Sequence, residues 1–179
     1  YKPDMTIETL AGIKKLHVIT QNDYVMKAVV DMGRAELAPD KIPVSLDGDM
    51  IVGRHVVIGG NPYDITCVSM GNPHCVVFVD DVEGLDLEKI GPKFEYDRLF
   101  PERVNTEFIQ MAGDNVLKMR VWERGSGETL ACGTGACAAA VAAVLNGHCD
   151  KNRDIRVILL GGELQIRYTD EAVYMTGDA

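Results

Sequence analysis

The alanine-rich segment from Gly133 to Asn146 most constrains the fold of this chain, because its composition favours one secondary structure. Alanine is the best helix former, only the glycines in the segment disfavour a helix, and Gly147 supplies a C-terminal stop. The segment therefore predicts a helix of about 14 residues, roughly 21 Å long. A surface of alanine methyl groups allows close packing, so we expect this helix to lie inside a barrel of strands.

Strand-like segments fill most of the remaining chain. Alternating or continuously apolar stretches bounded by glycine, proline and asparagine are typical of strands and turns. A short helix is expected at 85–90, stopped by Gly91-Pro92. The expected fold class is α+β and mostly antiparallel, with one buried helix. Hairpins are expected at 108–122 and at 155–168. Strands are expected at 5–10, 13–19, 25–32, 55–58, 63–70, 75–79, 108–111, 116–122, 155–160, 163–168 and 172–175.

The charge and the cysteines limit the partners. A net charge of -9, from 27 Asp and Glu against 18 Lys and Arg, does not fit nucleic acid or an anionic membrane surface. No apolar run reaches the roughly 18 residues of a membrane-spanning helix. Five cysteines without framework spacing argue against a disulfide scaffold and favour reduced thiols in a cytoplasmic protein. A small molecule is therefore the expected partner.

Cys132 directly precedes the predicted helix, in the order Cys-Gly-Thr-Gly. A helix N-terminus carries partial positive charge and free N–H groups, so we expect it to lower the pKa of this thiol. The N–H groups of Gly133, Thr134 and Gly135 can also take a substrate carboxylate, and glycine allows its close approach. An alternative interpretation stays open, in which Cys132 is a small buried apolar residue and the glycines simply cap a helix. Cys137, inside the alanine face, is interpreted as structural.

Two further segments carry side chains suited to an amino-acid ligand. Glu123 and Arg124 form a dipeptide that is usually a surface ion pair, but beside a thiolate it can hold an ammonium and a carboxylate group. A Gly-Asn-Pro turn fixes Asn72 and aims His74 in one direction, and a histidine near a thiol can tune its proton affinity. His74 and Cys75 lack a second pair at ligand spacing, so we expect no metal.

Three segments in order, GNPHCV, PERVNTEFIQ and ERGSGETLACGTGACAAA, resemble the diaminopimelate epimerase family. The similarity runs from about Met5 to the end of the chain. It implies one of two pseudo-symmetric lobes, each a mostly antiparallel, barrel-like sheet around a central helix. It also implies an enzyme without pyridoxal or any other cofactor, which interconverts LL- and meso-2,6-diaminopimelate in lysine and peptidoglycan biosynthesis. Proline-type racemases share the cysteine before Gly-Thr-Gly, but not the Glu-Arg-Gly-x-Gly-Glu-Thr segment that precedes it here.

The resemblance also implies roles for individual residues. Two cysteines on opposite faces of the substrate would transfer the α-proton, and Cys132 would be one of them. His74 and Glu123 would adjust the acidity of the cysteines. The groups implied to hold the substrate are the side chains of Asn72, Asn105, Glu123 and Arg124, for its distal end, and the N–H groups of Gly133 and Thr134, for the carboxylate beside the reacting carbon.

One departure from the family pattern limits what the chain is expected to do. The family's other cysteine lies in a Cys-Gly-Asn-Gly segment of an N-terminal half, and this sequence has no such segment. Cys75 is a poor substitute, because nothing places it opposite Cys132. We therefore interpret residues 1–20 as the tail of an N-terminal lobe or as connecting strands, and residues 21–179 as the C-terminal epimerase lobe. We expect the chain to fold without epimerising, with the missing N-terminal lobe as its partner, and a homodimer is a further expectation from the resemblance.

Two other classes of function are compatible with the residues. Cys132, His74 and Glu123 suit a hydrolase or transferase with a single covalent nucleophile. A non-catalytic amino-acid-binding module would need Cys132 only as a helix cap. Both rank behind the epimerase, as does a proline-type racemase.

Overall fold

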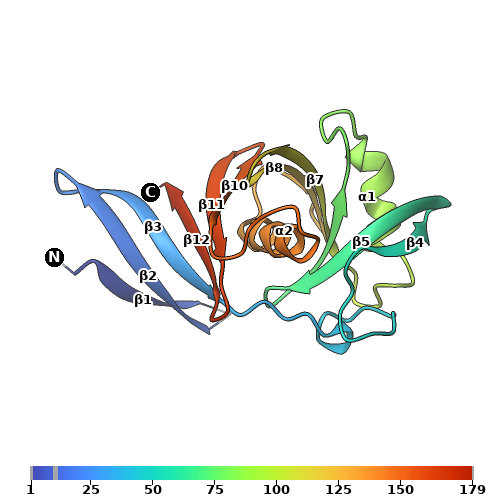
Figure 1. The fold of residues 1–179 in the computed structure, drawn as a ribbon, viewed down its shortest axis with the longest axis horizontal. Coiled ribbons are helices and arrows are strands. Elements are labelled where there is room, and N and C mark those ends of the chain that lie inside the picture. The colour runs from blue at the N-terminus through green and yellow to red at the C-terminus, as the bar shows by residue number, and fades with distance from the viewer. Residues whose placement is uncertain (1, 10–11, 179) are drawn as a thin grey trace.

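Twelve strands form one sheet that curls around helix α2 in the computed structural model, which describes residues 2–9 and 12–178 (Figure 1). The strand order is β1-β2-β3-β12-β11-β10-β8-β7-β6-β5-β4, and β9 pairs with β8 at the side. The helices are α1 (Leu87–Glu95), α2 (Gly133–Leu145) and a short 3-10 helix, η1 (Pro39–Lys41). The strands are β1 (Asp4–Thr9), β2 (Gly12–Gln21), β3 (Tyr24–Gly33), β4 (Arg54–Ile58), β5 (Asn61–Ser69), β6 (Pro73–Phe78), β7 (Asn105–Gly113), β8 (Val116–Glu123), β9 (Gly127–Thr129), β10 (Asp154–Leu159), β11 (Gly162–Tyr168) and β12 (Val173–Asp178).

Most neighbouring strands run antiparallel, as the sequence predicts. Among the described strands, β6 with β7 and β8 with β10 are the parallel pairs. Both predicted hairpins are confirmed, since β7 pairs with β8 and β10 pairs with β11 in antiparallel register. Leu10, the last residue of the expected strand at 5–10, lies outside the described residues. The α+β, mostly antiparallel fold class is confirmed.

Helix α2 forms where the alanine run predicts it. It begins at Gly133, after the N-cap residue Cys132, and ends at Leu145, with Asn146 as C-cap. All residues from Gly135 to Ala143 are buried, and the helix contacts strands β5–β8 and β10–β12. Strands lie on several sides of the helix (Figure 1), as the small alanine side chains allow. The helix is therefore a fixed central support, and its N-terminal end is held in one position relative to the strands. Neither described α-helix is long and apolar enough to cross a membrane.

Helix α1 extends beyond its expected end, so the predicted stop at Gly91-Pro92 is wrong. A proline inside a helix removes one N–H donor and costs stability. The following turn nevertheless buries Phe94 completely, with its ring centroid 5.4 Å from that of Phe108. Gly91 lies so close to Trp122 that a Cβ would be 2.2 Å from its ring. Packing of this last turn against the sheet outweighs the cost of the proline.

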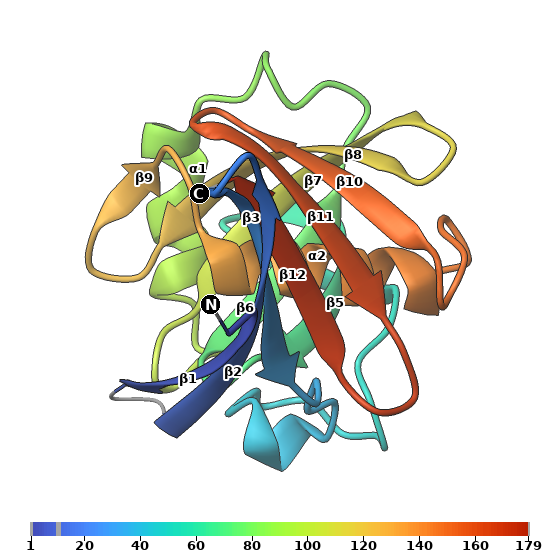
Figure 2. The ribbon, with the colours of Figure 1, turned by 90° about the vertical axis from the view of Figure 1, so that its left-hand side faces the viewer.

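Strands β1, β2 and β3 extend the sheet beyond the part that encloses α2 (Figures 1 and 2). They attach through the antiparallel pairing of β3 with β12, in which Gly33 lies opposite Val173. A groove of about 530 Å³ lies beside them, and Met5, Leu16 and Tyr174 are among its lining residues. The extension exposes the apolar side chains of Met5, Ile7, Ile13, Ile19, Tyr24, Val25 and Met26.

Candidate active site

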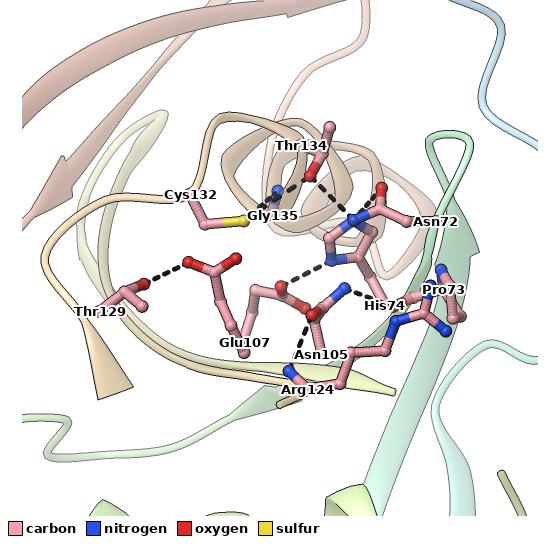
Figure 3. Close-up of polar contacts among 11 residues, drawn as sticks. Asn72, Pro73, His74, Asn105, Glu107, Arg124, Thr129, Cys132, Thr134 and Gly135 are labelled. Atoms are coloured by element: carbon pink, nitrogen blue, oxygen red, sulfur yellow. Dashed lines mark hydrogen bonds and ion pairs between the residues drawn. The ribbon is translucent and has the colours of Figure 1, made fainter. Parts of the chain in front are cut away.

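Residues selected from the sequence converge at the N-terminal end of α2, beside the starts of β6 and β7 and the end of β8 (Figure 3). The parallel register of β6 and β7 places His74 opposite Asn105. Asn72 lies in the turn before β6, and Arg124 follows β8 directly. The strand register and the fixed helix thus bring together segments that are more than 50 residues apart in the sequence.

Cys132 is the N-cap residue of α2. Its Sγ accepts a hydrogen bond from the Gly135 N–H at 3.3 Å, and the Thr134 hydroxyl oxygen lies 3.6 Å from Sγ. The residue is buried, with 7% of its surface exposed. The N–H groups of Gly133 and Thr134, at the first two helical positions, have no acceptor within their own helix and are available to a ligand.

The expected lowering of the Cys132 pKa is wrong. Burial raises the pKa of Cys132 to about 11, and the carboxylate charges of Glu107 and, more weakly, Glu123 act in the same direction. The hydrogen bonds with Thr134 and Gly135 lower it, but by less. The free energy lost when a thiolate is removed from water exceeds the stabilisation that these two hydrogen bonds at the helix N-terminus provide. Cys132 is therefore a thiol at neutral pH.

His74 belongs to a buried hydrogen-bonded chain that leads to the helix N-terminus (Figure 3). Its Nδ1 lies 2.7 Å from Glu107 Oε1, and its Nε2 lies 3.0 Å from Asn72 Oδ1. Asn72 in turn donates from Nδ2 to the Thr134 hydroxyl at 3.3 Å. His74 and Glu107 are both fully buried. The chain Glu107–His74–Asn72–Thr134 links strand β7 to the helix end that carries Cys132.

Sequence reasoning did not select Glu107. A signal was available, because alternate residues of a strand share a face and Glu107 lies two positions after Asn105. The Glu107 carboxylate also explains why residue 135 is a glycine. A Cβ at this position would lie 2.7 Å from Glu107 Oε1 and 3.1 Å from Cys132 Sγ. Carboxylate, thiol and helix backbone therefore occupy one tightly packed space.

Asn105 uses its amide to hold the surrounding backbone. Its Nδ2 donates to the Pro73 carbonyl at 2.9 Å, and its Oδ1 accepts from the Arg124 N–H at 3.0 Å. It is almost fully buried. Asn105 thus fixes Arg124 relative to the turn that carries Asn72 and His74.

Glu123 and Arg124 point to different partners. The Glu123 carboxylate accepts a short hydrogen bond from the Thr129 hydroxyl, whereas Arg124 donates from Nη1 to the Glu102 carbonyl at 3.0 Å. The usual interpretation of such a dipeptide as an ion pair does not describe them. The Glu123 carboxylate and the Arg124 guanidinium are thus each hydrogen-bonded to another residue rather than to one another. The Arg124 side chain is exposed.

Glu95 supports this turn from helix α1 and was also missed by sequence reasoning. Its buried carboxylate accepts from Trp122 Nε1 at 2.8 Å, from the Gly125 N–H at 2.9 Å and from Arg103 Nη1 at 3.3 Å. Burial alone would raise the pKa of Glu95, but these donors hold it below its ordinary value. The donors lie 8, 27 and 30 residues from Glu95 in the sequence, so no local pattern could have indicated these contacts.

Cys75 faces away from this site. It lies opposite Cys67 in the β5–β6 pair and belongs to the core cluster between the sheet and α1, whereas Cys132 and Cys137 belong to the cluster around α2. Consecutive strand residues point to opposite faces, so His74 faces the site and Cys75 does not. Across residues 2–9 and 12–178, no group of three or more His, Cys, Asp or Glu side chains is arranged to hold a metal ion.

Comparison with known proteins identifies the family. The family model for diaminopimelate epimerase matches residues 66–179, which include every site residue described above. The chain belongs to the diaminopimelate epimerase family. A diaminopimelate epimerase of Desulfovibrio desulfuricans is 52% identical over 187 residues, covering 99% of this chain and 64% of that protein. One of Acetivibrio thermocellus is 50% identical, covering 97% and 62%. This chain therefore spans less than two thirds of the length of these family members.

Solved structures show the same fold at low sequence identity. A hydroxyproline epimerase from Agrobacterium vitis matches with a TM-score of 0.70 and 13% identity, over 99% of this chain and 57% of that one. A probable proline racemase from Agrobacterium radiobacter matches with a TM-score of 0.69 and 13% identity, over 99% and 58%. At this identity the comparison establishes the fold shared with these isomerases.

Proposed function

We propose that this chain supplies one half of the catalytic site of a cofactor-independent epimerase that interconverts LL- and meso-2,6-diaminopimelate, in lysine and peptidoglycan biosynthesis. The observation that carries the proposal is the position of the Cys132 thiol, which caps α2 beside the Asn72, His74 and Asn105 network. The names of the relatives, all longer than this chain, support the choice of substrate.

The site geometry suits proton return to a carbanion. A substrate carboxylate docked on the N–H groups of Gly133 and Thr134 would place its α-carbon next to Cys132. Because burial keeps Cys132 protonated, it would act first as the acid that delivers a proton to this carbon. The helix N-terminus would stabilise negative charge that develops on the carboxylate during proton removal. Arg124 and Asn72 would hold the distal amino-acid group.

A second base has to remove the proton from the opposite face, and the described residues offer no thiol for this task. Cys67 and Cys75 lie in the other core cluster, Cys137 is enclosed in α2, and Cys149 lies beyond the C-terminal end of α2. Burial raises the pKa of Cys137 to about 12. We therefore propose that the chain alone is inactive and that its partner is an N-terminal lobe carrying the second cysteine.

The same proposal gives a role to the sheet extension. In a two-lobed enzyme, residues 1–20 would be the tail of the N-terminal lobe and residues 21–179 the C-terminal lobe. The exposed apolar side chains of β1–β3 support a partner on this extension, because such patches mark interaction surfaces. A homodimer of the complete enzyme is a further prediction, which light scattering would test.

Hydrogen exchange tests the proposed function. The 179-residue chain, incubated with diaminopimelate in deuterated water, should neither exchange the α-hydrogen nor change the isomer ratio. A chimera that joins this chain to the N-terminal lobe of the Desulfovibrio desulfuricans relative should do both, and Cys132→Ser in that chimera should abolish inversion. Inversion by the lone chain would contradict the two-lobe mechanism. Failure of a folded chimera to exchange any α-hydrogen would contradict the proposed function.

A hydrolase or transferase with a single nucleophile is less well supported. Such an enzyme needs a base within hydrogen-bonding distance of its thiol. His74 instead has both ring nitrogens engaged, with Glu107 and Asn72. No covalent adduct of Cys132 with an activated ester is therefore expected, and mass spectrometry would detect one. A purely amino-acid-binding module would keep its ligand affinity in Cys132→Ser.

A further inference from the structure

Glu107 is a buried carboxylate to which the proposed function assigns no role. The residue is fully buried, and its Oε2 has no hydrogen-bond partner among the described residues. A buried carboxylate is costly unless it is fully hydrogen-bonded, and an apolar residue of similar size is often more stabilising at such a place. A contribution to folding stability alone therefore does not account for a glutamate at position 107.

Within residues 2–9 and 12–178, the hydrogen-bond partner of the Glu107 carboxylate is His74. The carboxylate oxygen lies 2.7 Å from Nδ1, and the same register that pairs His74 with Asn105 sets Glu107 one step further along the shared face of β7. Gly135 closes over the carboxylate from α2, where any side chain would collide with it. The pair is thus enclosed by β6, β7 and the first turn of α2 and is held in one geometry.

The chemistry of the pair determines where the histidine proton lies. An ionised carboxylate only accepts hydrogen bonds, so Nδ1 has to carry a proton, and the hydrogen bond at one ring nitrogen sets the state of the other. Nε2 lies 3.0 Å from Asn72 Oδ1, which also only accepts, so Nε2 donates to it whenever it carries a proton. Nε2 is then the nitrogen whose proton can be gained or lost. Two titratable groups interact electrostatically with Glu107: Cys132 at the start of α2, and Cys75, which points to the other face of β6. Glu123, at the end of β8, acts in turn on Cys132.

We propose that Glu107 is a positioning residue that holds the Nδ1 proton of His74 and so makes Nε2 the exchangeable nitrogen facing the site. The kinetic part of this inference rests on the proposed epimerase function, whereas the protonation pattern of His74 does not. The arrangement follows the general logic in which a third group orients the base of a catalytic set.

Nitrogen-15 NMR of the 179-residue chain tests the protonation pattern directly. The wild-type spectrum should show Nδ1 of His74 protonated throughout the neutral pH range. Glu107→Leu, of similar size but without an acceptor, should move the proton to Nε2, whereas Glu107→Gln, which keeps an acceptor oxygen, should leave it on Nδ1. Thr106→Val is the matched control, because Thr106 is the adjacent buried residue on the opposite face of β7. An unprotonated Nδ1 in the wild type, or an unchanged tautomer in a folded Leu variant, would overturn the inference. The wild-type spectrum decides even if the Leu variant does not fold.

The chimera described above tests the kinetic consequence. Glu107→Leu should lower kcat about 10- to 100-fold, as losses of such supporting partners commonly do, with a smaller change in KM. Thr106→Val should leave kcat unchanged. A folded Leu variant with altered tautomer but full kcat would refute the positioning role. An inactive wild-type chimera would count against the proposed function, and the NMR result on His74 would stand apart from it.

Discussion

The reactivity of Cys132 gives the sharpest test of the site electrostatics, since two physical effects oppose each other there. The helix N-terminus favours a thiolate, whereas burial and Glu107 favour the thiol and raise the pKa of Cys132 to about 11. The ordinary pKa of a cysteine on the same scale is 9.0. The rise to about 11 predicts a thiolate fraction about 100-fold smaller at neutral pH. A more basic thiolate is roughly eightfold more nucleophilic, so the net reaction should be about 10-fold slower than that of an ordinary thiol.

Alkylation by iodoacetamide, followed by peptide mapping in a mass spectrometer, measures this rate. The Cys132 rate in the native 179-residue chain should rise about tenfold per pH unit up to about pH 10, without a plateau. The urea-unfolded chain supplies the ordinary thiol as reference, and the buried Cys137 should react more slowly still. Glu107→Gln should lower the pKa of Cys132 and speed its alkylation, because a neighbouring negative charge is removed. A plateau that begins below about pH 8.5 would show that the helix N-terminus outweighs burial, and the reasoning would be refuted.

Three further predictions concern stability and are measured by urea unfolding. Gly135→Ala should destabilise the chain by about 1–3 kcal/mol through overpacking. Gly133→Ala should be neutral or stabilising, because its Cβ would meet the flexible end of the Met175 side chain, with Sδ at 3.1 Å and Cε at 3.5 Å. Equal effects of the two substitutions would contradict the tight packing at Gly135. Glu95→Gln should cost about 1.5–3 kcal/mol at neutral pH, and because the folded pKa of Glu95 is lowered, this difference should vanish as the pH falls through that value. The raised pKa of Cys132 predicts stability that is complete below about pH 9 and is lost, by up to about 3 kcal/mol, as the pH rises toward 11, and Cys132→Ala should remove that part of the alkaline loss.

The local parts of the fold could be predicted because their signals lie within short segments. The alanine run, with glycine at both ends, defines α2, and the alternation around 108–122 and 155–168 defines two hairpins. The end of α1 could not be predicted, because what stabilises its last turn is contact with Phe108 and Trp122, which follow in later strands. Sequence patterns thus give the elements, and long-range packing adjusts their ends.

The residues of the candidate site also differ in whether local sequence patterns or only distant contacts reveal them. Asn72, His74 and Cys132 were selected from motifs, and the structure brings them together in one network. Glu107 and Glu95 were missed, because their significance lies in partners that are 30 or more residues away: His74 for Glu107, and Gly125 for one contact of Glu95. The direction of the Cys132 pKa was wrong for a related reason. A helix N-terminus is visible in sequence, but the depth of burial around it is not.

The pairing of β3 with β12 has a consequence for biosynthesis. Gly33 lies opposite Val173, so the two partners are 173 − 33 = 140 residues apart in the chain. At ribosomal rates of about 5–20 residues per second, the edge of β3 that pairs with β12 would stay unpaired for roughly 7–28 s, until β12 has been synthesised. An unpaired apolar strand edge is a template for association with other nascent chains. Slow translation or a late truncation should therefore favour aggregation of this protein, and a chaperone that covers β3 would shield it during that interval.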